Sequence, residues 1–225
     1  MNKNDAHILI AELEKNPERF FEEGRAYDLL QEYFKGEPVD SLGVLLTNAN
    51  PSIRKSAVWI VSELGGGAIS IAEQVLTLLN DDERYVKYYA LESLMVFSSS
   101  GLNKVFHHVV LALEDEDDVI SKLGMYLISK SSNSQLEEAI QYFSNAGENS
   151  HLQGLRSLLV HSSGVEQKDI GSALYSEDKF LAMYRAISIK REMEIHSRKI
   201  QFDSSLIEES IVKNFLNDYV CSQSS

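Results

Sequence analysis

The sequence has little of what stabilises secreted or membrane proteins. Its 225 residues include a single cysteine, Cys221, so no disulfide can form within the chain. A protein without disulfides is typical of a reducing compartment. No uninterrupted apolar stretch approaches the roughly 20 residues that a membrane-spanning helix needs. We therefore expect a cytoplasmic protein that is not embedded in a membrane.

Positive charge is also scarce. The chain carries 21 basic and 34 acidic side chains, which gives a formal net charge of −13. Such a balance repels phosphate backbones and anionic membrane surfaces, and it attracts cationic molecules. The composition therefore predicts no nucleic-acid partner and no membrane partner, and it favours a basic protein partner.

Helix-breaking residues are few, with three prolines and 12 glycines. Between them, apolar residues recur three and four positions apart, which is the pattern of amphipathic helices rather than strands. The hydrophobic content of 44% is sufficient for a buried core. The expected fold class is therefore all-α.

A repeat organises the middle of the chain. Leu46, Leu79 and Leu113 are separated by 33 and then 34 positions. Three later columns keep the same register, an aliphatic one, a small one and a second aliphatic one: Ile53, Val86 and Ile120; Ala57, Ala90 and Gly124; Val61, Leu94 and Ile128. A period in this range is typical of stacked helical hairpins. The small column suits a close crossing of two helices.

Polar turns at 48–52, 80–83 and 114–118 separate the two helices of each hairpin, and their side chains are suited to capping the second helix. The segments Asn-Pro-Ser-Ile-Arg-Lys-Ser-Ala at 50–57 and Glu-Arg-Tyr-Val-Lys-Tyr-Tyr-Ala at 83–90 resemble the start of the second helix in HEAT repeats. The basic column of this resemblance holds Arg54 and Lys87 but continues with Ser121. The clear resemblance covers about residues 38–131.

The resemblance implies a right-handed α-solenoid of HEAT-like hairpins with atypical capping helices at both ends. We expect one domain over residues 1–225, with clear repeats at 38–131 and degenerate repeats at 135–200. Helices at 5–23 and 26–35 are expected to cap the first end, and a helix at 204–220 the other. Repeat arrays need such atypical ends because their terminal faces meet water.

No constellation of catalytic or metal-binding residues emerges. There is no nucleophile elbow and no local cysteine-protease signature. His107 and His108 are adjacent, so on a helix they point about 100° apart. The acidic turn 114–118 lacks the glycine and distal glutamate of a calcium loop, and helix capping is its favoured interpretation. We therefore predict no catalytic residue, no metal and no cofactor.

The second helices carry the candidate binding residues opposite their apolar stripes. Trp59, Glu92 and Tyr126 occupy equivalent positions and are predicted to form a row across a concave groove. Exposed Trp and Tyr are enriched at binding hot spots. The predicted partner-binding residues are these three with Glu63, Tyr85 and Tyr88 on the same helices, and the acidic rim Asp81, Asp82, Asp115 and Asp117. The alternative is that the aromatic rings pack on neighbouring repeats or on a folded-back terminal segment.

A second feature is a basic cluster near the carboxyl end, comprising Arg185, Lys190, Arg191, Arg198 and Lys199. The favoured interpretation is a solvated helix whose cations pair with Glu192, Glu194 or the acidic body of the chain. A nucleic-acid patch is the alternative.

Three classes of function remain open. Small acidic helical stacks with groove aromatics resemble bacterial immunity proteins, which bind and neutralise a cognate toxin. A general HEAT-repeat adaptor or assembly factor is a second possibility. A helical-repeat enzyme, such as a DNA glycosylase or a chromophore lyase, is a third. A glycosylase needs a basic concave surface, whereas residues 1–150 carry 24 acidic and 12 basic side chains. The preferred interpretation is a non-catalytic protein-binding module.

Overall fold

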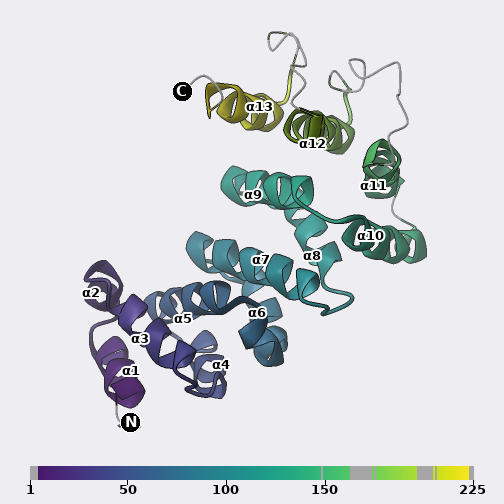
Figure 1. Cartoon of the computed structure of the whole chain (residues 1–225). Helices are drawn as coiled ribbons and strands as arrows, with labels where there is room; N and C mark the ends of the chain where they lie inside the picture. The colour runs from purple at the N-terminus through teal and green to yellow at the C-terminus, as the bar shows by residue number, and fades with distance from the viewer. Residues whose placement is uncertain are drawn as a thin grey trace. The chain divides into compact units, whose positions relative to one another are not determined.

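The computed structural model describes residues 5–147, 149–162, 174, 176–196, 205 and 207–222, and these are the residues discussed below (Figure 1). They contain helices and turns and no strand, which confirms the all-α prediction. Contacts along the chain divide it into two compact units, Met1–Leu102 and Asn103–Ser225. Each unit is described by itself, and a single continuous domain stays a prediction.

Unit 1 is built around α5, which packs on α2, α3, α4 and α7. Its elements are α1 (Asp5–Lys15), α2 (Pro17–Glu22), α3 (Arg25–Phe34), α4 (Asp40–Leu46), α5 (Pro51–Leu64), η1 (Gly65–Ile71), α6 (Ala72–Thr77), η2 (Leu78–Asn80) and α7 (Arg84–Ser99). The helix expected at 5–23 is two helices. A helix running through Pro17 would bring its ring against a carbonyl of the preceding turn, so α1 ends and α2 begins with Pro17 in its first turn.

Unit 2 contains α8 (Phe106–Leu111), η3 (Ala112–Glu114), α9 (Asp118–Ser129), α10 (Asn133–Ala146), α11 (Asn149–Ser162), α12 (Lys179–His196) and α13 (Ser210–Ser222). Helix α12 packs on α9, α11 and α13. Within the described residues of both units, no helix combines the length and the apolar composition needed to cross a bilayer.

The predicted turns cap the helices that follow them. The Asn50 side chain accepts a hydrogen bond from the Ser52 amide at 2.9 Å, and Pro51 opens α5. Glu83 accepts from the Val86 amide at the start of α7. The Asp117 side chain, just before α9, accepts from the Val119 amide at 2.9 Å. Each carboxylate or amide oxygen satisfies a backbone N–H group that the first turn of a helix leaves without a partner.

The repeat columns form the cores of the two units. Every member of the three later columns is buried, from Ile53 in α5 to Ile128 in α9. The first column is less regular, because Leu79 lies in the 3-10 turn η2 and is half-buried, while its neighbour Leu78 is buried. The tighter winding of a 3-10 turn moves the inward position by one residue. A Cβ atom on Gly124 would lie 3.1 Å from Ala112 Cβ in η3, so this member of the small column lies at a close approach of two elements.

The interpretation of the basic cluster as a solvated helix is wrong for Arg185 and Lys190, which are buried. The reason is that α12 is surrounded by three helices, and each residue from Ala182 to Lys190 is buried. Because these residues are consecutive, buried side chains lie on every side of α12. Arg191 Nη1 donates to the carbonyl oxygens of Ile128 and Ser131, where α9 ends.

Glu194 pairs at 2.7 Å with Lys130, the residue that follows α9. The predicted partners of Glu194 were the cations of the basic cluster, and Lys130 is not one of them. Arg198 and Lys199 of the same cluster lie outside the described residues.

Helices α11 and α12 approach each other closely at Gly154. A Cβ atom at this position would lie 2.1 Å from Cδ2 of the Tyr184 ring, far inside van der Waals contact. Tyr184 is buried on α12. Only glycine therefore lets the Tyr184 ring lie against the backbone of α11.

Candidate functional site

Unit 1 brings five of the predicted binding residues to one face of α5 and α7, which we call the α5–α7 face. Trp59 and Glu63 are four residues apart on α5, and Tyr85, Tyr88 and Glu92 follow one side of α7. The two helices pack directly on each other. The negative charge of Glu63 on α5 contributes to the raised pKa of Glu92 on α7.

The α5–α7 face is partly open to solvent. Tyr85 is 52% exposed, although it is a large aromatic residue, and Glu63 is also exposed. Tyr88 is half-buried, and its ring meets the ring of Tyr89 edge-on at 5.5 Å. Tyr89 was not among the predicted binding residues, and its place three residues before Glu92 on α7 could have indicated it.

The electrostatics of this face favour a cation. The pKa of Glu92 is raised by burial of its carboxyl group and by the nearby charge of Glu63. The pKa of Tyr89 is also raised, first by burial and then by Glu92. In both cases the negatively charged form is disfavoured, because burial removes water and neighbouring acids repel. A positive group placed here would relieve both effects.

Trp59 packs on a folded-back segment, which was the alternative to a fully open row. The Phe21 ring of α2 meets the Trp59 ring edge-on at 6.0 Å. The ammonium group of Lys55 lies 4.6 Å from the centre of the Phe21 ring. Trp59 remains half-buried. Nothing in the sequence signals Phe21 as its neighbour, because the contact depends on where α2 folds.

Asp81 and Asp82 of the predicted rim differ in their surroundings. The Asp81 side chain is 6% exposed and forms a two-pronged ion pair with Arg54, at 2.6 and 2.9 Å. Asp82 is exposed beside it. Asp81 therefore has a structural partner within unit 1, and Asp82 is the rim carboxylate that points to solvent.

The remaining rim residues, Asp115 and Asp117, bind backbone amides in unit 2. The Asp115 carboxylate accepts from the Asp117 amide at 2.9 Å, and the Asp117 carboxylate accepts from the Val119 amide at 2.9 Å. Both side chains stabilise the turn before α9. This agrees with helix capping as the interpretation of the acidic turn.

Tyr126 projects from α9 in unit 2 and is 46% exposed. Two lysines of the same chain make cation–π contacts with its ring. Lys190 of α12 lies 4.4 Å from the centre of its ring, and Lys130 lies at 5.6 Å. The ring centre of Phe215 on α13 is 4.8 Å from the same Lys190 ammonium group. The row that joins Tyr126 with Trp59 and Glu92 crosses from one unit to the other and stays a prediction.

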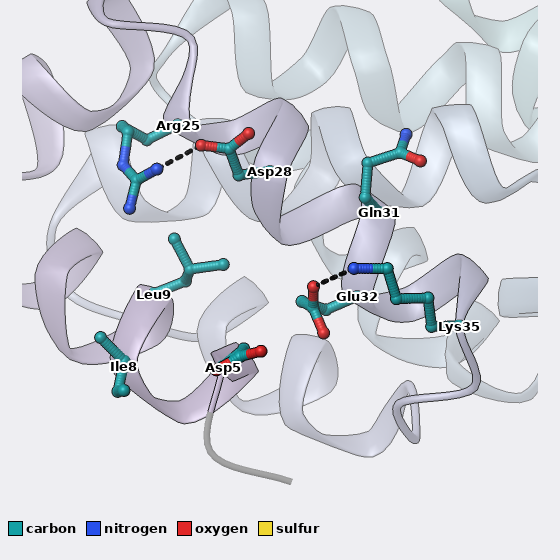
Figure 2. Close-up of a pocket in the computed structure, with 8 residues that line it drawn as sticks. All are labelled: Asp5, Ile8, Leu9, Arg25, Asp28, Gln31, Glu32 and Lys35. Carbon is teal, nitrogen blue, oxygen red and sulfur yellow. Dashed lines mark hydrogen bonds and ion pairs between the residues drawn. The ribbon is translucent and has the colours of Figure 1, made fainter. Parts of the chain in front are cut away.

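A pocket of about 520 Å³ opens between α1 and α3 (Figure 2). Its lining mixes apolar and charged side chains: Asp5, Ile8, Leu9, Arg25, Asp28, Gln31, Glu32 and Lys35. Arg25 pairs with Asp28, and Lys35 pairs with Glu32 at 2.6 Å, as the dashed lines in Figure 2 show. Because these acids and bases neutralise each other, the pocket offers little selectivity for a charged ligand.

A chain of three polar side chains runs through unit 2. His151 Nε2 lies 2.9 Å from Glu114 Oε1, and His151 Nδ1 lies 3.0 Å from the Tyr184 hydroxyl. The order resembles a catalytic relay, but His151 is 1% exposed and Tyr184 is also buried. Burial raises the pKa of Tyr184 well above its ordinary value, and the charge of Glu114 adds to this. The chain therefore joins η3, α11 and α12 and gives a substrate no access to the hydroxyl.

Within the described residues, no group of three or more His, Cys, Asp or Glu side chains is arranged to hold a metal ion. The site that collects predicted binding residues is thus the α5–α7 face. Comparisons of the chain with known protein families, with curated proteins and with solved structures found no match.

Proposed function

We propose that the chain is a non-catalytic protein-binding module that recognises a basic protein, and that its specific role is that of an immunity protein that neutralises a bacterial toxin. We also propose that its hairpins form a right-handed HEAT-like solenoid. The hairpin contacts of α4 with α5, α6 with α7 and α8 with α9 support the second proposal. The buried repeat columns support it as well.

The α5–α7 face carries the functional proposal. An exposed Tyr85 lies on the same helix face as Glu92, whose pKa is raised by burial and by Glu63. An aromatic ring gives a partner a large contact area at a small entropic cost, and tyrosine is enriched at hot spots. The two carboxylates are best satisfied by an arginine or lysine from outside the unit.

The net charge of −13 supports the same partner class. Long-range attraction between an acidic inhibitor and a basic enzyme accelerates their encounter, and mutual repulsion keeps the inhibitor from nucleic acid. Rapid association is what an inhibitor of a toxic enzyme requires. Enzymatic alternatives lack comparable support, because His151 and the Tyr184 hydroxyl beside it are buried.

The proposal is tested by replacing Tyr85 with a photo-cross-linking phenylalanine analogue and capturing the partner in the native host. We expect a basic enzyme whose activity is blocked by the wild-type chain. Glu92→Lys should weaken the complex at least about tenfold, because it places a cation against a cation. Glu137→Lys, at an exposed site on α10, is the matched control and should leave affinity unchanged.

One outcome would contradict the inhibitor role, and a second would contradict the choice of binding surface. A captured partner that keeps its activity in the complex would identify an adaptor or assembly factor instead. Complexes that are equally stable with Glu92→Lys and Glu137→Lys would show that the α5–α7 face is not the binding surface.

A further inference from the structure

In each unit, a helix outside the clear repeats packs on the outward face of a repeat helix. Lys55 on α5 and Lys122 on α9 are equivalent in the repeat, each two residues before the small column. In unit 1, α2 packs on α5 and places Phe21 beside Lys55 and Trp59. A short helix thus covers the outward face of α5 with an aromatic ring.

Unit 2 repeats this arrangement with a different helix. Helix α13 packs on α9 and α12. Its Asp218 pairs with Lys122 at 2.6 Å, and its Phe215 ring shares the ammonium group of Lys190 with Tyr126. An acid and an aromatic ring from α13 therefore meet the lysines and the tyrosine of this face.

The equivalent face of α7 has the opposite chemistry. Tyr88 stands where α5 and α9 have a lysine, and Glu92 stands where they have Trp59 and Tyr126. Within unit 1, α7 packs on α5, α6, η1 and η2, which leaves Tyr85 52% exposed. Helices that dock on α5 and α9 meet lysines. A helix that docks on α7 meets a carboxylate with a raised pKa.

We infer that the α7 part of the α5–α7 face docks an amphipathic helix of the partner, which presents an arginine or lysine to Glu92 and an aromatic or aliphatic side chain to Tyr88. This inference rests on the proposed function and adds the form of the partner's contact. Helices α2 and α13 show how a helix packs on this kind of face. Because α7 presents the carboxylate of Glu92 where α5 and α9 present an aromatic ring beside a lysine, the helix that docks on α7 must carry positive charge.

A second copy of this chain is a poorer occupant. Two copies repel each other through their net charges of −13. The docking helix of unit 2 brings Asp218, an acid, which would meet Glu92 unfavourably. The complementary occupant is therefore a basic helix from another protein.

The test uses the full chain and three synthetic helical peptides of about 18 residues. All three have the same apolar stripe with one phenylalanine, and their polar faces carry lysine and arginine, glutamate, or glutamine. Binding is measured by backbone amide shifts in NMR titrations. We expect the basic peptide to shift amides of α7 around Tyr88 and Glu92, and to bind at least about tenfold more tightly than the acidic peptide.

Variants connect binding to the named residues. Glu92→Lys should weaken the basic peptide at least about tenfold, and Tyr88→Ala should weaken all three peptides. Glu137→Lys on α10 should change none of the affinities. Equal binding of the three peptides, or shifts confined to other helices, would overturn the inference.

Failure of this inference differs from failure of the proposed function. If the basic peptide does not bind but the captured partner is lost on Glu92→Lys, the partner uses another kind of contact and the binding role stands. If neither the peptides nor the captured partner respond to Glu92→Lys, the inference fails, and so does the α5–α7 face as the binding surface of the proposed function.

Discussion

Arg54 and Asp81, which are 27 residues apart, join two successive turns of unit 1 by a two-pronged ion pair. The same guanidinium group donates to the carbonyl oxygens of Asn48 and Ala49, so it also holds the turn that precedes α5. One side chain thereby fixes the spacing of two hairpins. The third repeat has Ser121 at this position, and its hydroxyl donates to the carbonyl of Asp115 within its own turn.

Replacing Arg54 with leucine should destabilise unit 1 by about 2–4 kcal/mol, because Asp81 would keep a nearly buried charge without its partner. Urea unfolding followed by circular dichroism measures this. Arg19→Leu is the matched control, since the Arg19–Glu23 pair is exposed and an exposed pair adds little to stability. Equal losses for the two variants would contradict a special role for Arg54.

The Arg54–Asp81 pair should also make the free energy of unfolding depend on pH in the acidic range. Burial raises the pKa of Asp81, but hydrogen bonds from Arg54 and the Glu83 amide outweigh it, so the pKa lies below its ordinary value of 3.8. Its stabilising contribution is therefore present above pH 3.8 and is lost as the pH falls through the lower folded-state pKa. In Asp81→Asn this part of the pH dependence of the free energy of unfolding should disappear. If the variant loses as much stability below pH 4 as the wild type does, Asp81 is not the group responsible.

His107 should destabilise unit 2 when it becomes charged. Its ring is buried and stacks on the Tyr142 ring, with 3.8 Å between the ring centres. Its Nδ1 atom has no hydrogen-bond partner among the described residues. Burial, together with the neighbouring His108, lowers the pKa of His107 to about 4. The neutral form is favoured in the folded state. Stability should therefore be full above pH 6.5 and fall by up to about 3 kcal/mol as the pH approaches 4.

The measurement for His107 compares unfolding free energies at pH 7 and pH 4.5. In His107→Phe, which keeps the stacking on Tyr142, the difference between the two pH values should be smaller by about 2 kcal/mol or more. If the wild type and this variant lose the same stability, His107 is not the titrating group.

Gly154→Ala should destabilise unit 2 by about 3 kcal/mol or more, because the new methyl group would lie inside the Tyr184 ring. Gly67→Ala is the matched control, since a Cβ atom at Gly67 meets nothing within 4 Å. Thermal unfolding should show a large loss for the first variant and a change of less than about 1 kcal/mol for the second. Similar melting temperatures for the two variants would contradict the close approach of α11 and α12.

Lys190→Met should leave stability within about 1 kcal/mol of the wild type, although it removes a charge that lies over two aromatic rings. Burial lowers the pKa of Lys190, so the loss of the desolvation cost offsets the loss of the cation–π contacts. Lys190→Ala should cost about 2 kcal/mol or more, because it also leaves a cavity. Equal effects of the two substitutions on urea unfolding would contradict this balance.

Local pattern was enough to predict the repeat core. The inward positions of Ile53, Val86 and Ile120 follow from the repeat period and from the apolar stripe of each helix, and all three are buried. The capping residues Asn50 and Asp117 act on amides two residues away, so their role follows from the sequence alone. The burial of Arg185 and Lys190 did not follow, because it depends on which helices surround α12.

The candidate site was only partly predictable for the same reason. The helix face shared by Tyr85, Tyr88 and Glu92 follows from spacing on one helix. The contact of Phe21 with Trp59 joins residues 38 positions apart through the fold of α2, and no periodic pattern contains it. The pairing of Asp81 with Arg54 likewise required two turns to be adjacent in space.

Trp59 is the only tryptophan of the chain, and it belongs to unit 1, with Phe21 at its edge. Indole emission therefore reports on the melting of the first 102 residues alone, while ellipticity averages over all helices. Superimposed transitions of the two signals would mean that the halves melt as one cooperative body, and separate transitions would mean that each half melts on its own.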